Sequence, residues 1–224
     1  MSELSKIKNL EKLWVYTRDM HRASFPESEL EPIMGGGRLQ NPKFMFVFIN
    51  PTYKNVSSEK GWEGKRRPWI GTKYIWKIFR DAGHFDEGLL AEIAGKKEWD
   101  VGFADKVYQH LSYRDFYFTN LVKWTGENAD LPNSHKVKLF LPILKKEIEL
   151  VNPRFVVTFG QIPFSALTNE VIKLGDYYDE SVSSGSLRTF SLVVENKRYE
   201  VIPSYFPVGR GNPKRGTKIL SLLP

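Results

Sequence analysis

The stretch FMFVFINPT, residues 44–52, is the segment that most constrains the fold. Its first six residues are all apolar and rich in aromatic and β-branched side chains, and Asn50-Pro51 ends the run. A short apolar run of this kind, closed by a turn signal, is typical of a strand that is buried on both faces. We therefore predict a buried strand over residues 44–49, followed by a polar loop.

Other parts of the chain repeat this pattern and alternate it with helical spacing. The runs FYFTNLV (116–122) and FVVTFG (155–160) predict two more buried strands, and SLRTFSLVV and RYEVIPSYF predict a further pair around a turn at residues 195–197. Helices are predicted over residues 3–22, 72–82, 87–98, 135–150 and 161–168, with a short one from about residue 217. This alternation favours an α/β fold of three layers, α/β/α, with a central, mostly parallel sheet.

Composition narrows the class of protein. The 224 residues suit one compact domain, residues 1–224. The absence of cysteine excludes disulfides and thiolate-held metals or iron–sulfur clusters, and no two of the 4 histidines stand at a ligand spacing, so we expect no metal and no other cofactor. No apolar run reaches the roughly 18 residues of a membrane span, and the N-terminal residues do not resemble a signal peptide. We therefore expect an intracellular monomer (cytoplasmic, or nuclear in a eukaryote) with no membrane partner.

The charge balance favours an anionic partner. Lys and Arg number 33 against 26 Asp and Glu, which gives a net charge of +7 and an isoelectric point near 9.4. By itself this excess is weak evidence, since many basic proteins bind no nucleic acid. The distribution of the positive charge is stronger evidence than its amount, because positive residues gather in two loops that are rich in Gly and Pro. These residues are Lys60, Lys65, Arg66 and Arg67 in the first loop, and Arg210, Lys214, Arg215 and Lys218 in the second.

Polar or unusual residues follow three of the predicted strands. Asn50-Pro51 ends the first, Asn120 and Lys123 lie at the end of the second, and FPVGRGNPKRG (206–216) follows the last. In open α/β sheets the chemistry lies in the loops just past the carboxyl ends of the strands. The sequence therefore predicts a functional site at this edge of the sheet.

Four segments, taken in order, resemble the uracil-DNA glycosylase superfamily. They are FMFVFINPT, GWEGKRRPWIGTKYIWKIFRDAG, DFYFTNLVKW with LPILKKEIELVNPRFVVTFG, and VIPSYFPVGRGNP. The central part is closest to the thermostable iron–sulfur class, and the Asn-Pro first motif is similar to that of mismatch-specific glycosylases. The resemblance covers roughly residues 34–215. It implies a monofunctional DNA repair glycosylase that flips a base out of DNA and hydrolyses its N-glycosidic bond, with uracil or a related deaminated or mismatched base as the target.

The resemblance assigns the catalytic step to the first motif. Asn50, with Pro51 beside it, stands where the superfamily holds the water that attacks the anomeric carbon. Trp69, in a Pro-Trp-Ile-Gly run, stands where an aromatic side chain stacks on the flipped base. Ordinary structural roles stay open for both, since Asn-Pro can simply end a strand and most Trp side chains belong to a core.

Base recognition is implied for Asn120. Its carboxamide can donate to one edge atom of uracil and accept from the adjacent N3–H, a pair of bonds that cytosine cannot satisfy. The alternative is an Asn that caps the next turn. Ile49, Thr52 and Phe206 are expected to complete the pocket, and Thr52 or Tyr53 could wall it against a 5-methyl group.

The loops with basic residues are expected to contact DNA. Lys123 would either orient its loop or contact a phosphate, and Val208 or Arg210 would be the wedge that fills the vacated base stack. The remaining residues predicted to contact DNA are Arg66, Arg67, Lys214 and Arg215.

The sequence departs from the superfamily pattern in ways that bear on function. Phe206 replaces the motif His that helps to neutralise charge on the leaving base. The cysteines of the iron–sulfur class are absent, and Trp124 stands where one would fall, so packing must replace a cluster. Two rival hypotheses follow: a nucleic-acid-binding protein that keeps the fold but has weak or no catalysis, and an α/β hydrolase of small nucleotides. The glycine run 35–37 lacks the Lys-Ser/Thr of a phosphate loop.

Overall fold

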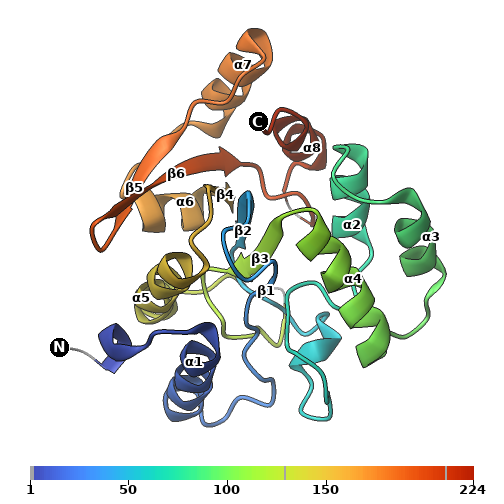
Figure 1. Cartoon of the computed structure of the whole chain (residues 1–224), viewed down its shortest axis with the longest axis vertical. Coiled ribbons are helices and arrows are strands. Elements are labelled where there is room, and N and C mark those ends of the chain that lie inside the picture. The colour runs from blue at the N-terminus through green and yellow to red at the C-terminus, as the bar shows by residue number, and fades with distance from the viewer. Residues whose placement is uncertain (1–2, 129, 210) are drawn as a thin grey trace.

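The computed structural model describes residues 3–128, 130–209 and 211–224. Within these residues the chain forms helices and strands that alternate along the sequence (Figure 1). In chain order they are η1 (Glu3–Lys6), α1 (Leu10–Ser24), β1 (Gly36–Gly37), β2 (Phe44–Phe48), η2 (Val56–Ser58), α2 (Tyr74–Asp81), α3 (Glu87–Gly95), α4 (Val101–Tyr113), β3 (Phe116–Asn120), α5 (Ser134–Val151), β4 (Phe155–Phe159), α6 (Gln161–Thr168), α7 (Leu174–Ser184), β5 (Phe190–Val194), β6 (Lys197–Ser204) and α8 (Pro213–Ser221).

The strands form one sheet in the order β1-β3-β2-β4-β6-β5. The four central strands are parallel, and β1 and β5 pair antiparallel at the two edges. Every residue of β2, β3 and β4 is buried, as expected for strands covered on both faces. The predicted α/β fold with a mostly parallel central sheet is confirmed.

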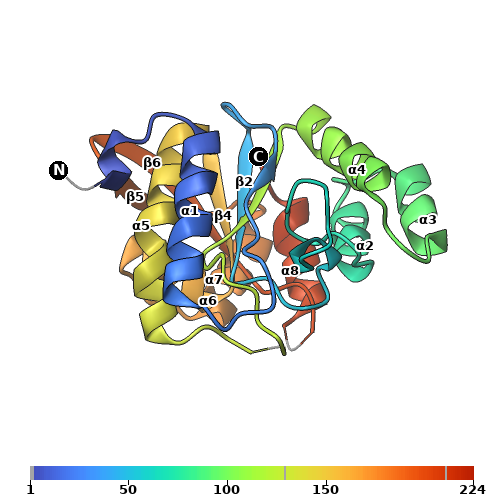
Figure 2. The ribbon, with the colours of Figure 1, turned by 90° about the horizontal axis from the view of Figure 1, so that it is seen from below.

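Helices cover both faces of the sheet and make the three predicted layers. Figure 2 shows α1, α5 and α6 on one side and α2, α3, α4 and α8 on the other. Side chains alternate between these layers along each strand. Phe118 of β3 packs against Phe79 of α2 with ring centroids 4.9 Å apart, whereas its neighbours Tyr117 and Thr119 hydrogen-bond to Glu147 of α5. This alternation decides which side chains of β3 share a face at the end of the strand.

Some elements differ from the sequence prediction. The helix predicted over residues 3–22 is split, because Asn9 caps α1 by accepting a bond from the Lys12 amide. The C-terminal helix begins at Pro213, four residues earlier than predicted. The helices α4 and α7 were not predicted. The apolar spacing of α4 is that of a helix, with buried Phe103, Val107 and Leu111, but α7 is largely polar and buries only two side chains.

The strand β1 was also missed, because two glycines give no strand pattern. A side chain at Gly35 would place its Cβ 2.2 Å from the Tyr117 hydroxyl, and Gly37 has φ of +111°. The glycine run therefore serves the close approach of the chain to β3, where only glycine fits.

Aromatic packing occupies the region around Trp124, the residue that stands at a cysteine position of the iron–sulfur class. Its ring centroid lies 6.3 Å from that of Phe25, which stacks on Phe140 at 6.2 Å. The Lys136 ammonium lies 3.0 Å from the Trp124 ring centroid, as in a cation–π contact. These contacts join the end of α1 to the loop after β3 and to α5. Among the described helices, none combines the length and apolar character that a bilayer span requires.

We expect Trp124→Ala to lower the free energy of unfolding by about 2 kcal/mol, because a large side chain is lost from a partly buried cluster. Trp124→Phe keeps an aromatic ring there and should lose less than half of that amount. Urea denaturation followed by circular dichroism measures both values. Equal stability of Trp124→Ala and the unchanged protein would show that this cluster does not hold the loop.

Candidate active site

The predicted site residues gather at the carboxyl edge of the parallel strands. Asn50 follows β2, Asn120 ends β3, and the loop that contains Phe206 follows β6. In the β2–β3 pairing Phe48 stands opposite Asn120, and the Phe48 ring stacks on Phe159 of β4 at 4.7 Å. Parallel pairing therefore brings loops that are far apart in the sequence to one place, as the strand ends predicted.

The Asn120 side chain lies on the sheet face covered by α2. Phe118, two residues earlier, faces α2, and side chains two apart in a strand share a face. Asn120 is only 2% exposed, yet its side-chain Nδ2 has no hydrogen-bond partner among the described residues. A buried donor without a partner costs about 1–3 kcal/mol, so in a native protein such a group is expected to bond to water or to a ligand. The amide is free to bind a ligand.

Trp69 borders the same place. Its ring lies 5.0 Å from Phe48, edge to face at 76°, and 6.4 Å from Phe206. The residue has φ of +66°, which is costly for a bulky side chain, and hydrogen bonds on both sides hold it there. Tyr108 donates to the Pro68 carbonyl at 2.5 Å, and Thr72 donates to the Trp69 carbonyl at 2.8 Å. The structure thus places the indole beside Phe48, the strand neighbour of Asn120.

Asn50 is fixed by a carbonyl that the sequence did not suggest. Its Nδ2 donates to the Pro51 carbonyl at 3.0 Å and to the Asp130 carbonyl at 3.2 Å. Among the described residues, no group donates to its Oδ1, which leaves an acceptor that can hold water. A backbone carbonyl has no sequence signature, so only the fold reveals the contribution of Asp130.

The loop that supplies this carbonyl is tied to the first motif. Gly126 donates to the Pro51 carbonyl at 3.0 Å, Tyr53 donates to the Gly126 carbonyl at 2.9 Å, and Thr52 forms a parallel bridge with Gly126. The two segments therefore form one paired wall of the site. Tyr53 is half exposed at its rim, whereas Thr52 is only partly exposed.

Ile49 and Phe206 form the opposite side. A Cβ built on Gly160, at the end of β4, would lie 3.8 Å from Ile49 Cδ1 and equally far from Phe206 Cβ. Phe206 also faces Trp69, so the predicted pocket residues Ile49, Trp69 and Phe206 lie around one centre with Phe48. Phe48 was not predicted to belong to the site, although its strand position identifies it.

A buried ion pair between Lys123 and Glu147 lies next to the Asn120 backbone. Lys123 donates to Glu147 at 2.5 Å and to the Asn120 carbonyl at 2.8 Å, and both charged side chains are almost wholly buried. Burial lowers the pKa of Lys123, and the Glu147 carboxylate acts in the opposite direction. Tyr117 and Thr119 donate to the same carboxylate at 2.7 and 2.9 Å. An interior ammonium cannot reach DNA, so the predicted phosphate contact of Lys123 is revised: of the two predicted roles, its position fits orientation of the loop.

The arginines of the first basic loop have partners within the protein. Arg66 donates to the carbonyls of Ser57 and Glu59, the latter at 2.7 Å, and burial lowers its pKa. Arg67 pairs with Asp105 at 2.8 Å, and its side chain is 13% exposed. Both arginines therefore hold the loop that carries Trp69.

In the second basic loop the residues differ in exposure. Arg215 bonds the Tyr205 hydroxyl at 2.8 Å and lies over the Tyr178 ring at 4.6 Å. Lys214 is exposed at the start of α8, and Val208 is partly buried. Arg210, the other predicted wedge residue, lies outside the described residues.

Comparison with known proteins identifies the family of the chain. The model of the uracil DNA glycosylase superfamily matches residues 34–221, a range that includes every site residue named above. A search of curated proteins found no significant match to the chain. The match extends from just before β1 to the end of α8 and so spans the whole sheet. The chain belongs to the uracil DNA glycosylase superfamily, a superfamily of DNA glycosylases.

Proposed function

We propose that this protein hydrolyses the N-glycosidic bond that joins uracil, or a related deaminated or mismatched base, to deoxyribose in DNA. The observation that carries the proposal is the buried Asn120 amide without a partner, next to Phe48 and with the Trp69 ring beside it. Membership of the superfamily supports the reaction class.

Recognition would follow base flipping. Asn120 Nδ2 would donate to O4 of uracil while Oδ1 accepts from N3–H. The face of Trp69 would stack on the base, an interaction worth roughly 1–3 kcal/mol. Cytosine has a donor where uracil has O4 and an acceptor where uracil has N3–H, so neither bond could form and the buried amide would remain unpaired.

In the chemical step Asn50 would hold the attacking water. Its amide nitrogen is engaged by two carbonyls, which fixes the orientation of the Oδ1 acceptor. The water oxygen forms a bond to C1′, the C1′–N1 bond breaks with its electron pair going to the base, and the water proton is released. Asn120 would stabilise the charge that develops on the base oxygen.

Lys214 and Val208 are proposed to contact the DNA backbone and the vacated stack, and Arg215, whose guanidinium bonds the Tyr205 hydroxyl, would hold the second basic loop in place. Arg66 and Arg67 would act by holding the Trp69 loop in place, because their guanidinium groups have partners within the protein.

Phe206 favours one second candidate, a DNA-binding protein with weak or no catalysis. The phenyl ring faces Trp69 and supplies neither charge nor proton to the leaving base. Incubation with a uracil-containing duplex, followed by alkali, separates the candidates, because only excision produces strand breaks. Binding without breaks would support the second candidate. Activity on free deoxyuridine without salt dependence would instead indicate a hydrolase of small nucleotides.

We expect Asn50→Ala to lower the single-turnover rate of excision by about 100-fold, because the water loses its positioning acceptor. The dissociation constant for uracil-containing DNA should change less than twofold. Asn50→Asp, which keeps an acceptor oxygen, is the matched control and should retain more activity. An unchanged single-turnover rate in Asn50→Ala would remove the assigned role.

We expect Asn120→Asp to reduce the preference for uracil over cytosine by about tenfold, since a carboxylate cannot donate to O4 of uracil but can accept from the cytosine amino group. Parallel single-turnover assays on the two bases in one sequence context measure the ratio. Loss of both activities in equal proportion would instead point to a purely structural Asn120.

Lys123→Met should lower the free energy of unfolding by about 3 kcal/mol, because the Glu147 charge is then buried without an opposite charge beside it. Adding Glu147→Gln should restore most of this stability, as measured by urea denaturation. If Lys123 also positions Asn120, by its hydrogen bond to the Asn120 carbonyl, the double variant Lys123→Met/Glu147→Gln will be stable but will still excise slowly. Full recovery of the rate would limit Lys123 to a structural role.

A further inference from the structure

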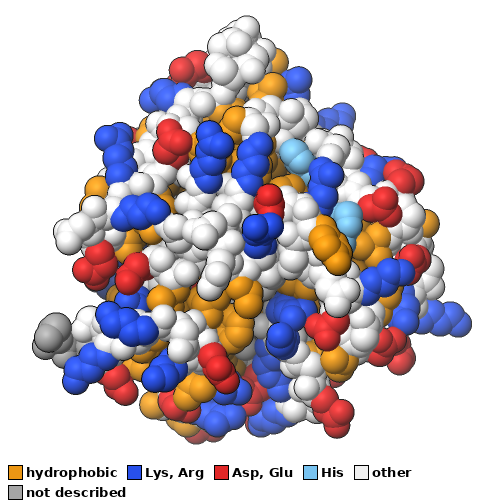
Figure 3. Space-filling view, in the orientation of Figure 1, with side chains coloured by type: hydrophobic (Ala, Val, Ile, Leu, Met, Phe, Trp, Pro, Cys, Tyr) orange, Lys and Arg blue, Asp and Glu red, His pale blue; other side chains and the backbone are white. Residues whose placement is uncertain are grey.

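A hollow lies away from the site just described, at the β1 edge of the sheet. Two adjoining cavities of about 300 and 590 Å³ open between α1 and α4 and share lining residues, among them Trp14 and Lys65. Figure 3 shows Lys and Arg side chains gathered in a depression between the regions that carry these helices. We term this hollow the edge groove. Asn50, Trp69 and Asn120 do not line it.

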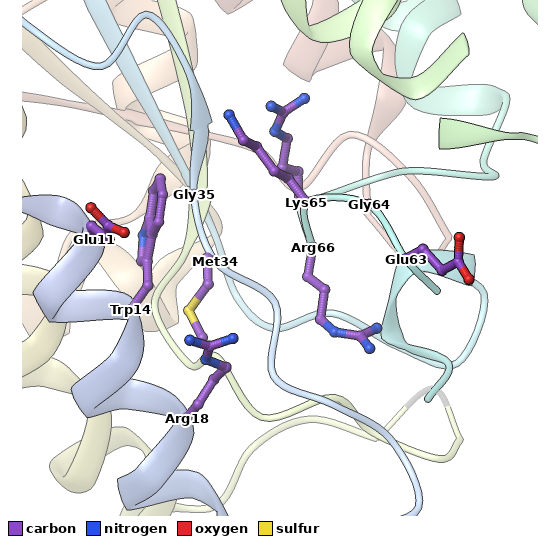
Figure 4. Close-up of a pocket in the computed structure, with 10 residues that line it drawn as sticks. Glu11, Trp14, Arg18, Met34, Gly35, Glu63, Gly64, Lys65 and Arg66 are labelled. Carbon is purple, nitrogen blue, oxygen red and sulfur yellow. The ribbon is translucent and has the colours of Figure 1, made fainter. Parts of the chain in front are cut away.

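Two aromatic rings line the edge groove, Trp14 in both cavities and Tyr113 in the larger one. Trp14 of α1 is half-buried, and Figure 4 shows its indole facing Lys65 across the cavity. Tyr113, the last residue of α4, is 86% exposed, although most tyrosines of this chain are buried or half-buried. Exposed aromatic faces of this kind can stack on a flat ring in a sequence-tolerant way.

The groove also holds positive charge that is not compensated. Among the described residues, the side chains of Arg18 and Lys65 have neither an ion pair nor a hydrogen bond. Neighbouring charges also affect Arg66: burial lowers its pKa most, Glu31 raises it, and the charges of Arg18 and Arg22 lower it further. An anion between these groups would relieve their repulsion.

The acidic residues of the lining do not cancel this charge. Asp105 is paired with Arg67 at 2.8 Å. Figure 4 shows Glu11 on the side of Trp14 that faces away from Lys65, and Glu63 on the far side of the loop. The centre of the groove is therefore bordered by an aromatic face and by cations.

We propose that the edge groove binds a single-stranded nucleic-acid segment, with an unpaired base on Trp14 and phosphates at Arg18 and Lys65. The inference rests on the proposed function, because the strand would be part of the DNA that offers a base to Trp69. One loop links the two places: it presents Trp69 to the site and Lys65 to the groove, and the Arg66 carbonyl accepts from Met34, which lines the groove.

A single strand fits this groove better than a duplex or an acidic peptide. Stacking on Trp14 and Tyr113 requires bases whose faces are free, and a duplex covers them. A peptide would satisfy the cations but would leave the aromatic faces without flat partners.

The test measures binding of the full chain to a fluorescein-labelled oligothymidylate without uracil, by fluorescence anisotropy. Tyr113→Ala removes an exposed ring and should weaken binding about fivefold or more. Trp14→Ala should weaken it at least as much, whereas Trp14→Phe keeps a stacking face and should bind within about twofold. Both Trp14 variants are first checked for an unchanged unfolding transition.

Salt dependence gives a second readout. Lys65→Ala should reduce the slope of log affinity against log salt by about 0.7, the value for one phosphate contact of a single strand. The control is Lys97→Ala, an exposed lysine between α3 and α4, which should leave the slope unchanged.

Unchanged affinity in Tyr113→Ala and Trp14→Ala, with an unchanged slope in Lys65→Ala, would overturn the proposal. Competition by thymidine monophosphate at the same concentration as the oligomer would also overturn it, in favour of a free nucleotide. Excision from a uracil duplex is measured in parallel. If the protein does not excise uracil but the variants still weaken oligomer binding, only the proposed function is contradicted. If excision is normal but the variants leave oligomer binding unchanged, only the proposed groove is contradicted.

Discussion

The parallel pairing of β2 with β3 sets Phe48 opposite Asn120, and the candidate site depends on this register. It directs the Asn120 amide toward the face that carries α2 and Trp69. A shift of β3 by one residue would turn Asn120 toward α5 and present Thr119 or Leu121 in its place. Because the strands are fully buried, such a shift would also move their apolar side chains, so core packing and site geometry are fixed by the same contacts.

The polar groups on the two sides of β3 differ in whether they have hydrogen-bond partners. On the α5 side, Glu147 receives bonds from Tyr117, Thr119 and Lys123, and the buried charges are paired. On the α2 side, the Asn120 Nδ2 and Trp69 Nε1 have no partner among the described residues. A satisfied network holds the strand end in place, while the unsatisfied groups beside it are available to a ligand. This asymmetry is the physical basis of the proposed recognition of uracil.

Aromatic side chains replace features of the superfamily at two places. Trp124 packs against Phe25, which in turn stacks on Phe140, at a cysteine position of the iron–sulfur class, as expected if packing substitutes for a cluster. Phe206 replaces the motif His and faces Trp69. Trp124 bears on the stability of a loop, whereas Phe206 bears on the stabilisation of charge on the leaving base. Membership of the superfamily therefore identifies the reaction class more securely than it identifies the rate or the preferred base.

Local sequence patterns were enough to predict the layered sheet and the edge at which the candidate site lies. Runs such as FMFVFI are local signals, and a parallel sheet necessarily gathers the residues that follow its strands, so Asn50 and Asn120 could be placed near each other. Their roles in catalysis remain predictions. Three features become visible only in the folded chain: Lys123 is buried against Glu147, the Asp130 carbonyl accepts a bond from Asn50, and Gly36 and Gly37 form a strand. These outcomes depend on partners far away in the chain, 80 residues in the case of Asn50 and Asp130, and local patterns do not encode such contacts.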